Sequence, residues 1–491
     1  MNDQNFQSTE QEEISASEGF EKRTSFFQID FLKAVMIFLV IFDHFVYRDV
    51  KGQIGAALWE RISIPIFLVV MGLNMGLSFK RQGATTLKQL YSWSYFKKKI
   101  LRYIVPFLIL YAVSTFIGLF IYGFDFIAMY DTQYYSSGYG IINLFHLIMP
   151  FWGPGNWFIP VLMQSILVVP LLYWAFTKKP VLTLILTFVI EIVMQLTVFF
   201  VIGDIIPYSS TYLEEIHILT MFMTSIPFYL SAVGLGMWFS MDHDLQSKHN
   251  FFMWIIYPIS LAYLVVYQFF GFKFMIDGTP LLRGDYHFLV FPYSAFLVLL
   301  ALKLLPNTST RKISKTISLI GRSTYHILLT QILGFGILTA FWGTHYGIYL
   351  PFDPFELIDL TALWLLFIWV GIIWYKIDLQ KDLTRRILYY LNFFILFPCI
   401  LFLTFWLQTS FVPIQLIVII LYAIAATILH FVIKKPLNTR ILSVWTGFLV
   451  ISFISMILQV EVFLPSEFWI LLIPMSVYFV FAVYFTLSNR S

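Results

Sequence analysis

The sequence predicts an all-α integral membrane protein, a polytopic helical bundle of about 14 transmembrane helices, and two observations support this fold class. Hydrophobic residues make up 59% of the 491 residues and charged residues only 12%, with a mean hydropathy of +0.81. Soluble domains contain about 25% charged residues on average. Fourteen apolar segments are also long enough to cross a bilayer as helices. The composition therefore excludes an ordinary soluble domain, and no nucleic-acid partner is expected.

The fourteen predicted spans follow one another along the chain, separated by polar connections. Their approximate limits are 28–47, 57–79, 100–122, 156–176, 181–202, 216–240, 251–272, 286–305, 317–342, 357–375, 387–407, 413–433, 441–460 and 467–487. Residues 141–152 are apolar too, but they contain Pro150 and end at Gly153-Pro154-Gly155. Because these residues interrupt a helix, the segment is predicted to be re-entrant or interfacial rather than a further span.

The basic residues predict how the spans are oriented. With the N-terminus in the cytoplasm, the cytoplasmic segments hold 25 of the 31 Lys and Arg residues and the external loops hold five. Lys33 is the remaining one and lies within the first span. Cytoplasmic loops of membrane proteins carry such an excess of basic residues. Both termini are therefore predicted inside, and the cell membrane is the expected location.

Composition also divides the chain into three parts. Residues 1–23 are polar and acidic, which predicts a disordered cytoplasmic tail rather than a cleavable signal peptide. Residues 24–376 carry ten spans and nearly all the polar residues found within spans. Residues 377–491 predict an appended four-span module with no visible chemistry, because its four spans (about 387–487) are almost purely aliphatic and aromatic. Cys399 is the single cysteine, so no disulfide or cysteine metal site is expected within the chain.

The first span carries the clearest candidates for chemistry, because ionisable residues inside a membrane are costly. Lys33 and His44 stand about 16 Å apart along the helix axis, near its opposite ends. His44, near the external end, is suited to act as a general base toward a hydroxyl, and an interfacial histidine bonded only to water is the alternative. Asp43 points about 100° away from His44, so it is not expected to orient the imidazole directly.

Other polar residues within or beside the spans are weaker candidates. Lys33 either snorkels to the membrane surface or binds an anion between helices. Lys97, Lys98, Lys99 and Arg102 either bind phosphates of a nucleotide cofactor or only set the topology. Asn156 and Trp157 open the fourth span at its external mouth, and Glu191 lies mid-membrane, where it must be paired or protonated. Further loose candidates are Gln164, His217, Asp285 and His287.

No phosphate-binding glycine loop, zinc-type spacing or nucleophile elbow occurs in the sequence, so no metal is expected. Five short motifs do follow one another within residues 24–376. They are Lys33 and His44 with ten residues between them, Ile64-Pro65-Ile66-Phe67-Leu68-Val69-Val70-Met71-Gly72, Lys98-Lys99-Ile100-Leu101-Arg102-Tyr103-Ile104-Val105-Pro106, Asn156-Trp157-Phe158-Ile159-Pro160-Val161-Leu162, and Gly321-Arg322-Ser323-Thr324-Tyr325-His326-Ile327-Leu328-Leu329-Thr330-Gln331. In this order they resemble the membrane-bound acyltransferase 3 family.

The resemblance implies an O-acyltransferase that moves an acyl group, commonly acetyl from acetyl-CoA, to a hydroxyl of an extracytoplasmic or membrane-attached glycan or lipid-linked sugar. It implies that His44 is the catalytic residue and that Lys33, Lys99 and Arg102 contact the phosphates of acyl-CoA. Asp43, Asn156 and Trp157 are the candidate substrate-binding residues.

The chain departs from the family pattern at three places. Lys33 replaces an arginine, Gln331 stands where the family often has histidine, and Leu162-Met163 stand where one branch has two glutamates. Two other functions therefore remain open. Fourteen spans with both ends inside suit a transporter or flippase for a lipid-linked or small polar solute, although the two halves show no internal repeat. The substitutions at Lys33 and Gln331 also allow a non-catalytic structural or sensor derivative of the same scaffold.

Overall fold

A computed structural model describes most of the first 380 residues of the chain. The described residues are 26–46, 48–59, 61–121, 155–205, 224–241, 251–276, 279–282, 286–342, 354–380, 386 and 390. The chain divides into two compact units, Met1–Lys376 and Ile377–Ser491. The predicted tail, the apolar segment 141–152 and nearly all of the last four predicted spans lie outside the described residues. What was predicted for them stays a prediction.

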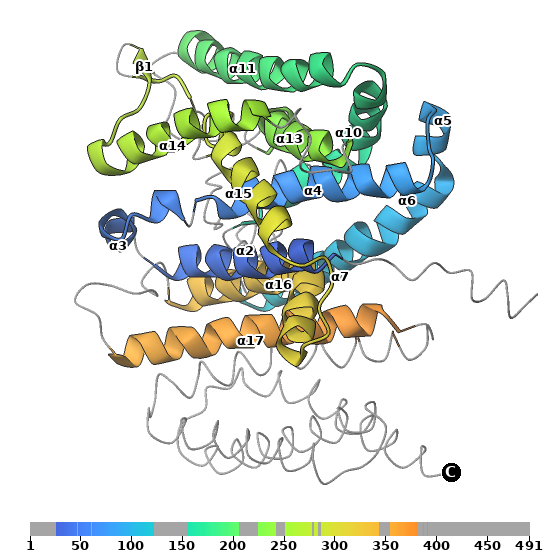
Figure 1. Cartoon of the computed structure of the whole chain (residues 1–491). Helices are drawn as coiled ribbons and strands as arrows, with labels where there is room; N and C mark the ends of the chain where they lie inside the picture. The colour runs from blue at the N-terminus through green and yellow to red at the C-terminus, as the bar shows by residue number, and fades with distance from the viewer. Residues whose placement is uncertain are drawn as a thin grey trace, which may run out of the picture. The chain divides into compact units, whose positions relative to one another are not determined.

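Helices form almost all of the described part of the first unit (Figure 1). The α-helices are α2 (Phe27–Phe45), α3 (Arg48–Gln53), α4 (Ser63–Arg81), α5 (Leu87–Leu90), α6 (Trp93–Lys99), α7 (Val105–Ile121), α10 (Phe158–Lys178), α11 (Pro180–Ile205), α13 (Leu230–Met241), α14 (Met253–Phe270), α15 (Phe291–Leu304), α16 (Lys312–Trp342) and α17 (Pro354–Asp378). The described residues also form two 3₁₀ turns, η1 (Ala56–Leu58) and η3 (Ile226–Tyr229), and a π-helical turn, η2 (Ile100–Ile104). A small antiparallel ribbon pairs β1 (Met275–Ile276) with β2 (Thr279–Pro280).

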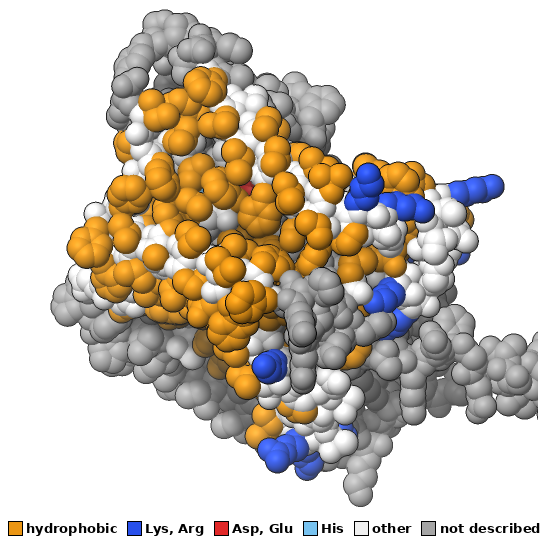
Figure 2. Space-filling model, turned by 45° about the horizontal axis from the view of Figure 1, so that its top comes forward, with side chains coloured by type: hydrophobic (Ala, Val, Ile, Leu, Met, Phe, Trp, Pro, Cys, Tyr) orange, Lys and Arg blue, Asp and Glu red, His pale blue; other side chains and the backbone are white. Residues whose placement is uncertain are grey.

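The described helices have the character of membrane spans. Among the described residues, four segments are long and apolar enough to cross a bilayer, namely Ser63–Arg81, Phe158–Lys178, Pro180–Phe200 and Met253–Phe270. Figure 2 shows a face covered with hydrophobic side chains, with Lys and Arg at its margin. Large apolar side chains along α11 and α14, such as Ile185 and Ile259, are exposed at the protein surface. Extended apolar surface of this kind marks contact with lipid. The all-α membrane class is thus confirmed, while fourteen spans and their orientation stay predictions.

Close helix contacts build the centre of the unit. The helices α4 and α13 lie side by side (Figure 1), and glycines occupy their contact. A Cβ added at Gly72 would lie 2.2 Å from Val233 O, and one at Gly236 would lie 1.9 Å from Val69 O. Small residues allow such backbone approach in membrane proteins, where helices cannot rely on a hydrophobic driving force. The backbones of α4 and α13 are therefore in close contact, and α2 packs against α4 as well.

Helices α2 and α16 run side by side in the same direction (Figure 1). Near the start of α2, Asp30 pairs with Arg322 of α16. At the end of α2, the ring of Phe45 packs edge-on against Phe335 at a centroid distance of 4.9 Å. Because the two helices are parallel, the N-terminal end of α2 lies beside Arg322 and its C-terminal end lies beside Phe335.

Several helix boundaries differ from the predicted spans. The second predicted span, 57–79, forms a helix only from Ser63, after the η1 turn. Pro65 then lies in the first turn of α4, where its missing N–H removes no helical hydrogen bond. The predicted start at residue 100 falls instead inside continuous helix, since α6, η2 and α7 follow one another from Trp93 to Ile121. The basic run therefore lies within a helix and not at its beginning.

Candidate functional site

Two polar groups occupy the two ends of α2. Asp30 and Lys33 lie in its first turns, and Asp43 and His44 lie in its last turn. The parallel neighbour α16 contributes a residue to each end. Arg322 reaches the first group, and Gln331, about 14 Å further along the helix, reaches the second.

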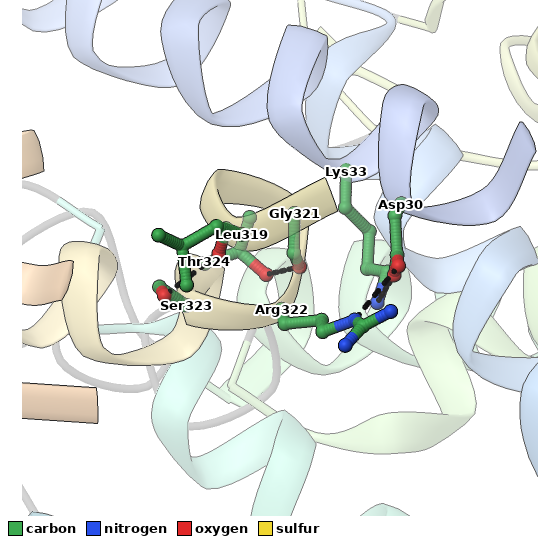
Figure 3. A network of polar contacts seen from close by, with 7 residues as sticks. All are labelled: Asp30, Lys33, Leu319, Gly321, Arg322, Ser323 and Thr324. Carbon is green, nitrogen blue, oxygen red and sulfur yellow. Dashed lines mark hydrogen bonds and ion pairs between the residues drawn. The ribbon is translucent and has the colours of Figure 1, made fainter. Parts of the chain in front are cut away.

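The first group is organised by Asp30. Its Oδ1 accepts from Lys33 Nζ at 3.1 Å, and its Oδ2 accepts from Arg322 Nε at 3.1 Å (Figure 3). The Asp30 side chain is only 5% exposed, whereas that of Arg322 is 45% exposed. Lys33 follows Asp30 by three residues, which places both on the same face of α2. Lys33 therefore lies beside a buried carboxylate, with which its ammonium forms an ion pair.

Gly321 brings α16 close enough for this ion pair to form. A Cβ added at Gly321 would lie 2.0 Å from Asp30 O, so the two backbones touch at this point. The hydroxyls of the next residues form hydrogen bonds within α16 itself. Ser323 donates to Leu319 O at 2.8 Å, and Thr324 donates to Gly321 O at 2.9 Å (Figure 3). The glycine thus sets the helix separation, and the next residue places its guanidinium on Asp30.

Lys99, at the end of α6, and Arg102, in η2, add two further basic side chains near the first group. The Lys99 ammonium lies 5.5 Å from the ring centroids of both Tyr95 and Tyr103, and the Arg102 guanidinium lies 5.3 Å from that of Tyr103. Tyr325 of α16 ties this segment in place by donating its hydroxyl to Tyr103 O at 2.8 Å. Such cation–π contacts hold basic side chains in defined positions.

Electrostatic effects connect these basic residues. Lys33 lies within electrostatic range of Arg102. Burial lowers the pKa of Lys99 below its ordinary value of 10.5, and the neighbouring Arg102 acts in the same direction. Lys33, Lys99, Arg102 and Arg322 thus form a basic cluster, which we name by these four residues. The three residues predicted to contact the cofactor are therefore brought together, and the structure adds Arg322 and Asp30.

At the other end of α2, Asp43 approaches His44 after all. Asp43 Oδ2 lies 3.6 Å from His44 Nδ1, while Oδ1 pairs with Lys51 of α3. The separation exceeds a hydrogen-bond distance but falls within the range of an ion pair. Helical spacing predicted that Asp43 would not orient the imidazole directly. The Asp43 carboxylate nevertheless lies on the Nδ1 side of the ring.

The Nε2 side of His44 faces a different set of groups. A Cβ added at Gly155 would lie 3.7 Å from His44 Nε2 and 3.6 Å from Gln331 Nε2. Gly155 itself has φ +92°, a conformation that favours glycine. The His44 ring also packs edge-on against Phe335 at 5.8 Å. His44 and Gln331 therefore converge on the backbone of Gly155, although their sequence positions are far apart.

Asn156 lies next to this convergence, while Trp157 belongs to an aromatic cluster. Asn156 is fully buried, and neither side-chain nitrogen nor oxygen has a hydrogen-bond partner among the described residues. Burying an unpaired amide costs free energy, which makes Asn156 a candidate for binding a polar substrate group. Trp157 instead stacks near Tyr229 and Tyr286, at centroid distances of 5.5 and 5.8 Å.

The remaining candidates bond to the scaffold. Glu191 is fully buried and accepts from the backbone N–H of Ser231 at 3.2 Å and from its hydroxyl. These hydrogen bonds to Glu191 thus come from a neutral serine. Gln164 bridges α10 to the η3 turn through Thr224 O and Ile226 N.

His287 lies beside the hydroxyl of Tyr263 at 3.2 Å. His217 and Asp285 lie outside the described residues. Within the part of the chain that the structure describes, no group of His, Cys, Asp or Glu could hold a metal ion.

Comparisons with known proteins identify the family. The sequence model of the acyltransferase 3 family, described as an acyltransferase domain, matches residues 26–374. No curated protein and no solved structure matches the chain. The matched region begins at the residue before α2 and ends within α17, so it contains both polar groups described above. The chain belongs to the acyltransferase 3 family and is an integral membrane acyltransferase.

Proposed function

We propose that the protein transfers an acyl group, acetyl in the first instance, from acyl-CoA to a hydroxyl of an extracytoplasmic or membrane-attached glycan or lipid-linked sugar. One observation carries this proposal. The paired helices α2 and α16 carry Lys33 and Arg322 of the basic cluster at one end and the imidazole of His44 at the other.

The basic cluster suits the phosphates of the acyl donor. Arginine binds phosphate oxygens in a bidentate way, and lysine adds a strong point charge. Lys33 and His44 are separated by about 16 Å along α2. A donor bound by its phosphates at the basic cluster can therefore extend its thioester arm along α2 toward His44.

His44 acts as the general base in this proposal. Its Nε2 takes the proton of the acceptor hydroxyl, and the hydroxyl oxygen attacks the thioester carbonyl. The tetrahedral intermediate then collapses and the C–S bond breaks. The leaving CoA thiolate takes the proton that His44 had accepted, which gives CoA–SH and restores the neutral imidazole. Asp43, on the Nδ1 side, stabilises the imidazolium between these steps. An intermediate acylated on His44 is the alternative route for the same overall transfer.

Two amides could donate hydrogen bonds to the reacting carbonyl in this proposal. Gln331 lies close to the backbone of Gly155 on the Nε2 side of His44, and Asn156 follows that glycine directly. Amide N–H donors aimed at a developing oxyanion stabilise the transition state. The replacement of histidine by Gln331 is compatible with this role, since an amide donates a hydrogen bond as a histidine does.

The test is acetyl-CoA turnover by the purified protein in nanodiscs, with envelope glycans as acceptor. CoA release should require both the acceptor and His44, and should be lost in His44→Ala. His287→Ala is the matched control, because His287 bonds to Tyr263 and lies outside the proposed site. Full CoA release by His44→Ala, or solute counterflow without any acyl-CoA turnover, would contradict the proposal.

A further inference from the structure

Asn156 carries a buried amide that the fold does not use. The residue is 0% exposed, and within the described residues neither Nδ2 nor Oδ1 forms a hydrogen bond. The amide of Gln28, which is also buried, behaves differently. It donates to Leu302 O at 3.1 Å and to Leu305 O at 2.7 Å. Because an unpaired buried amide costs free energy, packing alone gives no reason for an asparagine at position 156.

Helix capping does not explain Asn156 either. It lies two residues before α10, a region where asparagine side chains commonly accept from backbone N–H groups of the first turn. Here backbone carbonyls accept instead: Phe158 N donates to Gly155 O at 3.1 Å, and Ile159 N donates to Asn156 O at 3.0 Å. The side chain of Asn156 forms none of these bonds. The turn therefore fixes the backbone of Asn156 and leaves its amide for a ligand.

This amide belongs to the segment that meets the proposed catalytic residue. Asn156 follows Gly155 directly, and a Cβ added at Gly155 would lie 3.7 Å from His44 Nε2. In the proposed reaction, Nε2 takes the proton of the acceptor hydroxyl. We therefore expect the acceptor to lie next to the residue that bears the unused amide.

A primary amide recognises a ligand that presents a donor and an acceptor side by side. Oδ1 only accepts and Nδ2 only donates, whereas a hydroxyl does both. Two hydroxyls on adjacent carbons of a sugar fit this pattern, because one accepts from Nδ2 while its neighbour donates to Oδ1. An isolated hydroxyl satisfies only one of the two atoms. The trans amide of an acetamido group also satisfies only one, because its N–H and C=O point in opposite directions.

We propose that Asn156 binds a vicinal diol of the acceptor sugar, so that the protein acylates a hydroxyl only where the hydroxyl on the adjacent carbon is free. This inference rests on the proposed transfer to a sugar, with the bonds made and broken as described there. The attacked hydroxyl accepts from Nδ2 and gives its proton to His44, and the adjacent hydroxyl donates to Oδ1. The second N–H of Nδ2 remains for the reacting carbonyl. Once one hydroxyl carries the ester, the pair no longer fits, and each diol is acylated once.

The experiment measures kcat/KM for transfer from acetyl-CoA by the full chain in nanodiscs. The acceptors are methyl hexopyranosides and their monodeoxy derivatives, which lack one hydroxyl next to the acylated position. The wild type should lose about tenfold or more with the monodeoxy acceptor, because that acceptor leaves the buried amide partly unpaired. Asn156→Leu should acylate the parent sugar about tenfold more slowly and no longer distinguish it from the derivative.

Thermal unfolding separates this role from a structural one. Leucine has a similar volume and removes the unpaired amide, so Asn156→Leu should unfold at the wild-type temperature or higher. Gln164→Leu is the matched control, since Gln164 is an amide of α10 that bonds to Thr224 O and Ile226 N. This control should unfold at a lower temperature and keep the preference for the diol. A lower unfolding temperature of Asn156→Leu would assign the amide to the fold and overturn the inference.

The remaining outcomes separate this inference from the proposed function. If the wild type acylates neither the methyl hexopyranosides nor envelope glycans, the proposed function is wrong. If it acylates only the glycans, NMR of the product should show a free hydroxyl on a carbon adjacent to each acetylated one. Equal rates for parent and monodeoxy acceptors, acetyl groups on adjacent carbons, or unchanged selectivity in Asn156→Leu would overturn the role of Asn156 while transfer to sugars stands.

Discussion

Asp30 of α2 and Arg322 of α16 are 292 positions apart in sequence, yet their side chains meet with an Nε–Oδ2 distance of 3.1 Å. The same carboxylate also binds Lys33 through its other oxygen. Asp30 thus joins two helices and orders two cations of the basic cluster.

Asp30→Asn should destabilise the protein. The substitution leaves Lys33 and Arg322 without their buried counter-charge, and breaking one partner of a buried pair costs several kcal/mol. Because the Arg322 side chain is 45% exposed, we expect a smaller loss of about 2 kcal/mol. The measurement is unfolding in detergent by heat or denaturant. A double-mutant cycle with Arg322→Gln should give a clearly non-additive result, and additive effects would show that the two residues are not coupled.

Gly321→Ala should disturb the contact between α2 and α16. Its Cβ would lie 2.0 Å from Asp30 O, so the helices must separate, at a cost of about 1–3 kcal/mol. CoA affinity should fall in parallel, because Arg322 moves with the helix. Gly52→Ala is the matched control: a Cβ there meets nothing within 4 Å, and stability should be unchanged. Equal behaviour of the two variants would argue against a close approach at Gly321.

Gly155→Ala should impair turnover more than folding. The added methyl would lie 3.7 Å from His44 Nε2 and 3.6 Å from Gln331 Nε2, where a reacting group is proposed to sit. We expect at least a tenfold loss of kcat/KM, or about 1.4 kcal/mol in the barrier.

Gly271→Ala provides the control for Gly155→Ala. Gly271 has φ +64° with open space around it. An alanine there should therefore cause a similar backbone strain of about 1 kcal/mol, but its methyl group would not approach His44. The two variants should lose similar stability, and only Gly155→Ala should lose activity. A matching loss of activity in Gly271→Ala would assign the effect to strain.

The affinity for CoA should depend on pH through Lys99. Burial lowers the pKa of Lys99 from 10.5, and the protonated ammonium is the form that attracts phosphate. Affinity should therefore be highest at neutral pH and fall as the pH rises toward 10, as Lys99 loses its proton. Lys99→Arg should remove this fall, since arginine stays protonated. The measurement is a binding titration from pH 7 to 10, and identical profiles for the two proteins would exclude Lys99 from the site.

The sequence by itself determined the class of the protein and the main features of α2. The low content of charged residues and the apolar runs predicted a helical membrane protein, and the described helices agree. The order of the five motifs predicted the acyltransferase 3 family, which the family match to residues 26–374 confirms. Helical rise alone placed Lys33 and His44 near opposite ends of one helix, because both lie on the same segment.

Only the tertiary structure decided which helices meet and by which faces. Arg322 appeared in the sequence as one of many basic residues, and its partner Asp30 and the close approach at Gly321 could not be predicted. Gln331 appeared only as a departure from the family pattern, and its place near Gly155 and His44 emerged from the packing of α16. The physical reason lies in the membrane. Lipid and a neighbouring helix are equally apolar, so hydrophobic periodicity does not reveal which face of a span contacts which partner.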